Sequence, residues 1–166
     1  MTNILEKIIT DKKDSIKKYK DSFAIEYLNK KISSYKKYLD FKAKLMEKKV
    51  SVIAEIKKAS PSAGIIIQNY DPKIIAKQYF DSGATCLSVL TEEKHFQGQL
   101  EHIKEIKDEV KLPVLCKDFF IDPYQVYLAK SFGADAILII LSAIDEKIAK
   151  EIYDVADKLN ISVIVE

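Results

Sequence analysis

Residues 52–62, VIAEIKKASPS, form an apolar run that carries charges and then breaks into a Ser-Pro-Ser loop. The run is typical of a β-strand, in which alternate side chains face the same side. Ile53, Glu55 and Lys57 are therefore expected on one face, with both charges at the carboxyl end of the strand. This pattern indicates a functional strand end, or else a strand that leaves the core there and meets water.

Two later segments repeat the pattern. Residues 112–119, LPVLCKDF, are apolar up to Lys117, and residues 161–166, ISVIVE, are apolar up to Glu166. If the three strand ends converge, two amines and two carboxylates surround one cavity. Groups that transfer protons or bind anions would then lie together, which favours a site over a coincidence of solvated ends.

An internal repeat sets the spacing of the elements. Asp71-Pro72 and Asp122-Pro123 each read as a helix N-cap followed by proline at the first helical position. Gly83 and Gly133 follow as helix ends, so the repeat is about 50 residues long and holds two strand–helix pairs. Strands are expected to begin near residues 51, 86, 112, 136 and 161.

Apolar strands that alternate with helices predict an α/β fold with a parallel sheet covered by helices. The short repeat favours a (β/α)8 barrel of the TIM type over a doubly wound sheet, and no G-x-G-x-x-G follows the first strand. Such barrels usually hold about 250 residues, whereas only five strands are expected here. We therefore expect residues 50–166 to be a partial barrel, truncated after its fifth strand. Residues 1–49 form an N-terminal helical extension, with amphipathic helices over residues 3–20 and 24–48.

The composition excludes several classes of protein. The net charge is +2 and 31% of the residues are charged, which describes a mixed surface. Lysines cluster within residues 12–37, but acidic and apolar residues at helical spacing separate them, so a solvated helix face is favoured over nucleic-acid binding. No signal peptide or membrane span is expected, which indicates a cytoplasmic protein.

The cysteines and histidines give no sign of a metal site. Cys86 and Cys116 lie in apolar runs and are expected to be small buried residues of a protein in a reducing compartment. His95 and His102 are isolated among charged residues and are expected at the surface. No spacing of these residues suits a metal ion.

Five segments in order resemble indole-3-glycerol phosphate synthase, the barrel enzyme of tryptophan biosynthesis. They are residues 53–62, 86–98, 112–119, 122–125 and 133–138. The resemblance extends over the whole chain, including the two N-terminal helices. It implies a carboxy-lyase that closes a ring, releases carbon dioxide and removes water without a cofactor or metal. The product, indole-3-glycerol phosphate, forms from 1-(2-carboxyphenylamino)-1-deoxyribulose 5-phosphate, a small phosphorylated substrate.

The resemblance implies four catalytic residues: Lys117, Lys57, Glu166 and Glu55. Lys117 matches the general acid that protonates the ketone oxygen during ring closure. Lys57 matches a lysine that binds the substrate anion and takes part in proton transfer. Glu166 matches the general acid or base of the dehydration, and Glu55 matches the carboxylate that orients the lysines.

The resemblance also implies four substrate-binding residues: Ser60, Phe96, Phe119 and Leu138. Ser60 matches a serine at the substrate-binding end, with turn capping as the alternative. The three apolar residues match the wall around the aromatic ring, with a plain place in the barrel core as the alternative.

Two other functions stay open on the sequence. Barrels of this kind typically bind phosphate at the loops after strands seven and eight, so the chain alone is expected to be inactive. It is either the synthase or a non-catalytic half-barrel that needs its missing C-terminal strands or a partner half. A phosphoribosyl isomerase fits less well, because the two lysines and two glutamates are not expected there. The synthase is expected as a monomer or fused to a neighbouring tryptophan-pathway enzyme.

Overall fold

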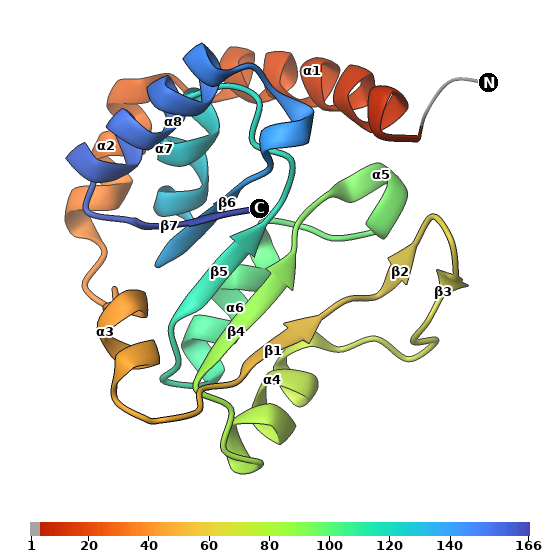
Figure 1. The fold of residues 1–166 in the computed structure, drawn as a ribbon, viewed down its shortest axis with the longest axis vertical. Helices are drawn as coiled ribbons and strands as arrows, with labels where there is room; N and C mark the ends of the chain where they lie inside the picture. Colours follow the sequence, from red (N-terminus) through yellow and green to blue (C-terminus); the bar gives the residue numbers. More distant parts are fainter. Residues whose placement is uncertain (1–3) are drawn as a thin grey trace.

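The computed structural model describes residues 4–166 and contains a sheet of five parallel strands in the order β1-β4-β5-β6-β7 (Figure 1). The strands are β1 (Ile53–Ile56), β4 (Cys86–Leu90), β5 (Val114–Lys117), β6 (Ala136–Ile139) and β7 (Ser162–Val165). Each begins within two residues of the start predicted from the sequence. A second, two-stranded antiparallel sheet pairs β2 (Ala59–Ser60) with β3 (Gly64–Ile65).

Helices connect consecutive strands. They are α4 (Pro72–Asp81), α5 (Glu93–Phe96), α6 (Glu101–Glu109), α7 (Tyr124–Ser131), the 3-10 turn η1 (Leu141–Ala143) and α8 (Glu146–Lys158). Of these, α4, α6, α7 and α8 cover one face of the sheet, whereas the short α5 and η1 lie in the loops after β4 and β6. The N-terminal extension adds α1 (Ile4–Ser22), α2 (Ile25–Ser34) and α3 (Phe41–Met46). This arrangement is a partial TIM barrel, as predicted.

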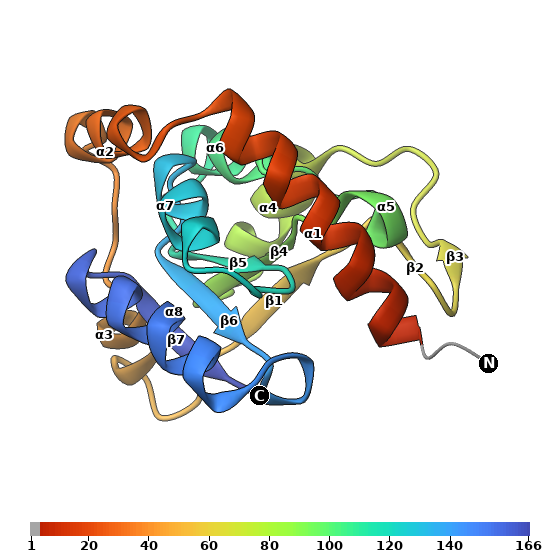
Figure 2. The same cartoon turned by 90° about the horizontal axis from the view of Figure 1, so that it is seen from above.

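The alternation of side chains along the strands produces two apolar cores. The outer face of the sheet packs against the helices through residues such as Leu87, Val114 and Ile137. The inner face carries Cys86, Leu115, Ala136 and Leu138, and Phe41 of α3 packs on it. In Figure 1, α3 lies beside the amino ends of the strands. In Figure 2, α1 runs diagonally over the molecule with α5 beside it.

The predicted helix over residues 24–48 is wrong. Residues 35–40 are not helical and separate α2 from α3. Hydrogen bonds to the barrel hold this segment instead. The amide of Leu39 donates to Asp135 Oδ1 at 2.7 Å, and the side-chain hydroxyl of Tyr38 donates to Lys130 O at 2.8 Å. Gly133 admits this crossing, since a Cβ there would lie 2.8 Å from the hydroxyl of Tyr35. The first predicted helix corresponds to α1, and its residue 3 lies outside the described residues.

The predicted helix ends agree closely with the structure. Asp71 caps α4 by accepting from the amides of Lys73 and Ile74. The second cap is off by one position, because α7 begins at Tyr124. Gly83 and Gly133 end their helices with φ angles of 85° and 100°, where glycine is the favoured residue.

The prediction of surface histidines is wrong. His102 is 9% exposed, and its ring centroid lies 5.4 Å from that of Tyr70. His95 keeps 10% of its side chain exposed, because Asp11 of α1 covers it and contacts Nε2 at 2.8 Å. Cys86 and Cys116 are buried free thiols, as predicted. None of the helices in residues 4–166 has both the length and the apolar character of a membrane span.

Candidate active site

Three of the charged residues predicted from the sequence meet at the carboxyl ends of β1 and β5. Glu55 Oε1 lies 2.7 Å from Lys57 Nζ, and Glu55 Oε2 lies 3.1 Å from Lys117 Nζ. The strand β4 separates β1 from β5, so the lysines approach Glu55 from its own strand and from across the sheet. Each side chain is about one third exposed, with values of 32–37%. The three groups are therefore accessible to solvent rather than sealed in a core.

The electrostatics of the cluster keep Glu55 charged. Partial burial alone would raise the pKa of this carboxyl, but the hydrogen bonds and charges of Lys57 and Lys117 outweigh burial and hold the pKa below its ordinary value. Glu55 is thus a carboxylate at neutral pH and accepts from both ammonium groups. Both lysine side chains thus lie within hydrogen-bonding distance of one carboxylate.

Glu166 continues β7 at the far side of the sheet. Its amide donates to Ile139 O at 2.9 Å, and its carbonyl accepts from Leu141 N at 2.9 Å. Ile164 packs in the inner core, so alternation places Glu166 on the same inner face. Its side chain is exposed, and it takes part in none of the ion pairs found in residues 4–166. The structure brings three of the four charged residues into contact and sets the fourth at the same end of the sheet.

The predicted apolar wall divides into a pair and a separate residue. The rings of Phe96, at the end of α5, and Phe119, after β5, lie 6.3 Å apart at 39°, and both residues are half-buried. Leu138 is 4% exposed and belongs to the inner core with Phe41 and Leu115. Leu138 therefore has the surroundings of a core residue, whereas the two phenylalanines offer aromatic surface.

Ser60 is the last residue of β2, directly before the turn to β3. Its Oγ accepts from Ala63 N at 3.1 Å and lies 3.4 Å from Ser62 Oγ. The hydroxyl thus caps the turn, which is the alternative raised from the sequence. Its place after β1 also puts it on the same side of the sheet as Lys57.

Comparison with known proteins identifies the family. The sequence model described as Indole-3-glycerol phosphate synthase matches residues 5–166. The chain belongs to the indole-3-glycerol phosphate synthase family.

Curated relatives with this name show the same extent of similarity. The proteins of Trichodesmium erythraeum and Prochlorococcus marinus strain MIT 9215 are 43% and 44% identical to this chain over 166 residues. The protein of Acaryochloris marina is 40% identical over the same length. Each match covers 99% of this chain but only 55–56% of the relative. The chain therefore spans little more than half the length of these relatives.

The strand β4 has no charged residue at its end, yet it contributes inner-face residues between β1 and β5. Leu90 pairs in register with Lys117 and is 3% exposed, so it lies between the two lysine-bearing strands. Ser88 pairs in register with Glu55, and its buried Oγ has no hydrogen-bond partner within residues 4–166. The strand is uncharged to its end, so the pattern of charged strand ends does not indicate these residues.

Two contacts in the loop after β4 fix the position of Phe96, and no local sequence pattern predicts either of them. Glu92 is 2% exposed and accepts from the amides of residues 94, 95 and 96, which caps α5. Gly98 lies against the end of β4, where a Cβ would stand 2.2 Å from Leu90 O. The Glu92 cap before Phe96 fixes α5, and the close approach of Gly98 after Phe96 holds the loop against the end of β4. Across residues 4–166, no three histidine, cysteine or acidic side chains are arranged to hold a metal ion.

Proposed function

We propose that the chain supplies the amino-terminal part of an active indole-3-glycerol phosphate synthase. The substrate is 1-(2-carboxyphenylamino)-1-deoxyribulose 5-phosphate, which closes a ring and loses carbon dioxide and water to give indole-3-glycerol phosphate. The observation that carries the proposal is the Glu55 carboxylate, which holds two ammonium groups at 2.7 and 3.1 Å at the carboxyl ends of barrel strands. Active sites of TIM barrels lie at that end.

Each charged residue has a role that suits its position. Lys117 donates a proton to the ketone oxygen as the new carbon–carbon bond forms, and Lys57 binds the substrate anion and shares in proton transfer. Glu55 orients both lysines, consistent with its lowered pKa. Glu166 exchanges a proton in the dehydration, and its exposed place at the end of β7 leaves it open to substrate.

The aromatic part of the substrate fits the paired rings. Phe96 and Phe119 offer faces at 39° to each other beside the lysines' strand ends, and aromatic rings favour such tilted contacts. Leu138 lines the inner face below them, and Ser60 contributes from the loop after β1. The paired rings support a substrate that carries an anthranilate-like ring. The phosphate of that substrate requires binding groups beyond these residues.

A second candidate function follows from the open sheet. The strands β1 and β7 each have one neighbour in this sheet, and the phosphate of such substrates typically binds after the seventh and eighth strands of a barrel. The second candidate is therefore a half-barrel that becomes active only with further strands, supplied by its own chain or by a partner. Cytoplasmic location and a monomeric or fused state stay predictions.

A reconstitution assay tests the proposal. The chain is assayed for fluorescent indole-3-glycerol phosphate, alone and together with the C-terminal portion of the Trichodesmium erythraeum relative that lies beyond the matched part. We expect turnover only in the mixture. Turnover by the chain alone would show that further strands are dispensable. No turnover in a mixture shown to associate would contradict the synthase assignment.

A further inference from the structure

A buried ion pair joins the N-terminal helix to the residue after Lys117. Lys12 Nζ of α1 lies 2.7 Å from Asp118 Oδ1, and their side chains are only 7% and 9% exposed. Burial alone would lower the pKa of Lys12, but the neighbouring Asp118 outweighs burial and the pKa is raised. The lysine is therefore charged, and an ion pair withdrawn from water in this way fixes its two partners in one geometry.

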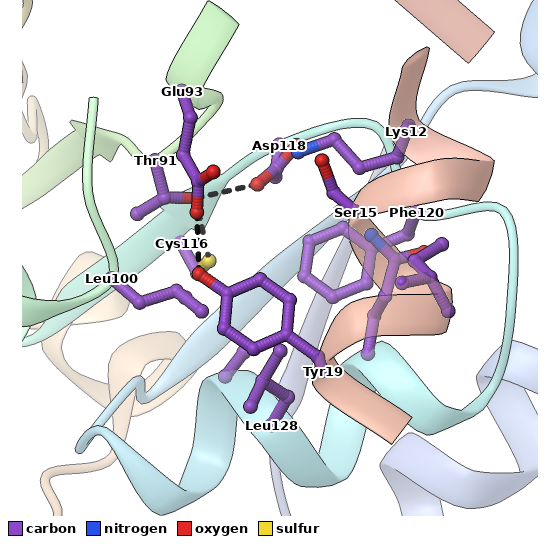
Figure 3. A pocket seen from close by; sticks show the side chains of 13 residues that line it. Lys12, Ser15, Tyr19, Thr91, Glu93, Leu100, Cys116, Asp118, Phe120 and Leu128 are labelled. Carbon is purple, nitrogen blue, oxygen red and sulfur yellow. Dashed lines mark hydrogen bonds and ion pairs between the residues drawn. The ribbon is translucent and has the colours of Figure 1, made fainter. Parts of the chain in front are cut away.

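Asp118 uses both of its oxygens to hold the ends of two strands together. Oδ2 accepts from Thr91 Oγ1 at 2.9 Å (Figure 3), and Oδ1 accepts from Phe119 N at 2.7 Å. The backbone adds a further link, because Thr91 N donates to Lys117 O at 3.1 Å. The carboxylate thus connects the end of β4, the end of β5 and the first residue of the following loop.

The direction of Lys117 depends on this arrangement. Neighbouring residues of an extended chain point to opposite sides, so Lys117 turns to the inner face while Asp118 turns outward to α1. A rotation of the backbone that released Asp118 would also move Lys117 away from Glu55. Among residues 4–166, Asp118 has the partners Thr91, Phe119 and Lys12, and of these Lys12 alone comes from outside β4, β5 and their loops.

The space around the ion pair has no room for a ligand. Lys12, Tyr19, Thr91, Cys116 and Asp118, which Figure 3 labels, are among the residues that line a cavity there. Its volume is about 20 Å³, which is enough for about one water molecule. Substrate binding therefore does not explain the charges buried there. The ion pair between Lys12 and Asp118 instead fixes α1 against the strand ends.

The same helix also holds the loop that carries the other phenylalanine of the wall. Asp11 accepts from His95 Nε2 at 2.8 Å and from Lys94 Nζ at 2.5 Å, and Tyr19 Oη donates to Glu93, so three side-chain contacts join α5 to α1. Phe96 follows directly at the end of α5. The neighbours Asp11 and Lys12 thus connect α1 to both loops of the candidate site.

We propose that Lys12 is a positioning residue for the synthase reaction, which directs Lys117 toward Glu55 by holding Asp118. This assignment rests on the proposed function for its catalytic consequence and on the contacts above for its structural one. Lys12 touches no reacting atom, and it acts through Asp118 alone.

Amide hydrogen exchange tests the structural part without any need for activity. The Lys12→Met variant should speed exchange at the amides of Thr91 and Phe119 by about tenfold, the factor that one lost hydrogen bond allows. The matched control is Lys20→Met, which breaks the exposed pair with Asp122 from the same helix and should leave both amides unchanged. Unchanged exchange in Lys12→Met would overturn the proposal whether or not the protein is a synthase.

Kinetics in the reconstituted enzyme test the catalytic part. Lys12→Met should lower kcat by about ten- to a hundredfold, because small misplacements of catalytic groups have effects of this size, with KM changed much less. Lys12→Arg should restore most of kcat, and Lys20→Met should match the wild type. Faster exchange with wild-type kcat would overturn the link to Lys117. An inactive wild type would refute the proposed function. The exchange measurement on Lys12→Met would still decide whether Lys12 holds Asp118.

A second variant applies if Lys12→Met does not fold. Thr91→Val keeps the shape of the side chain and removes only the hydroxyl that donates to Asp118 Oδ2. It should raise the exchange at Phe119 and lower kcat in the same sense by a smaller factor. Wild-type exchange and wild-type kcat in Thr91→Val would contradict the role given to Asp118.

Discussion

Replacing Lys107 by methionine should unfold the protein at a much lower temperature. Lys107 Nζ lies 2.6 Å from Asp135 Oδ2, and the two side chains are 1% and 0% exposed. Removing one partner of a buried ion pair typically lowers the free energy of unfolding by about 3–5 kcal/mol, because the other charge stays buried and unpaired. Asp135 would still accept from the amides of Leu39 and Val114, so we expect the lower end of that range.

The expected shift in Tm is large enough to measure by circular dichroism. A loss of about 3 kcal/mol corresponds to a fall of roughly 6–12 °C for a domain of this size. The matched control is Lys150→Met, which breaks an exposed pair with Asp154 whose side chains are 73% and 57% exposed. Such surface pairs contribute about 0–1 kcal/mol. A Tm for Lys107→Met within about 2 °C of the wild type, or an equal fall in the control, would refute the reasoning.

Three further changes address the site and the loop beside it. Lys117→Ala should lower kcat of the reconstituted enzyme by about 10²–10⁴ with a much smaller effect on KM; a change confined to KM would make Lys117 a binding residue. Glu55→Gln should be less stable than the wild type at neutral pH, because the wild-type carboxylate contributes stability above the ordinary glutamate pKa. The wild type loses this contribution as the pH falls through the lowered pKa of the folded state. Acid unfolding curves of the two proteins should therefore converge at low pH, and curves that stay parallel would count against this linkage. Gly98→Ala should lower the free energy of unfolding by about 1–3 kcal/mol, since its Cβ would meet Leu90 O at 2.2 Å; a urea midpoint equal to that of the wild type would show that the loop adapts.

The strands and the lysine cluster could be predicted because their signals are local. Each strand is a short apolar run bounded by charges or turn residues, and alternation along β1 is enough to place Glu55 and Lys57 on one face. Lys117 follows from the same rule applied to β5. Convergence of these ends follows from the parallel sheet, which brings all carboxyl ends to one side.

Other features depend on contacts between distant segments. The residues 35–40 have helical periodicity, and only the buried carboxylate of Asp135 shows why they are extended. Lys12 is one of many lysines in α1, and its burial depends on Asp118, far along the chain. His95 is covered by the same helix. No local pattern distinguishes these residues from their solvated neighbours.

The most direct test of the central claim, that the ends of β1, β5 and β7 form one active site, is the rate of the Glu166→Gln variant. Glutamine keeps the size of the side chain and removes the carboxylate, and the exposed position predicts little change in Tm. In the reconstituted enzyme we expect kcat to fall by about 10²–10⁴, with a ring-closed intermediate accumulating before dehydration. A wild-type kcat across the pH range would remove Glu166 from the site and separate β7 from the catalytic ends of β1 and β5.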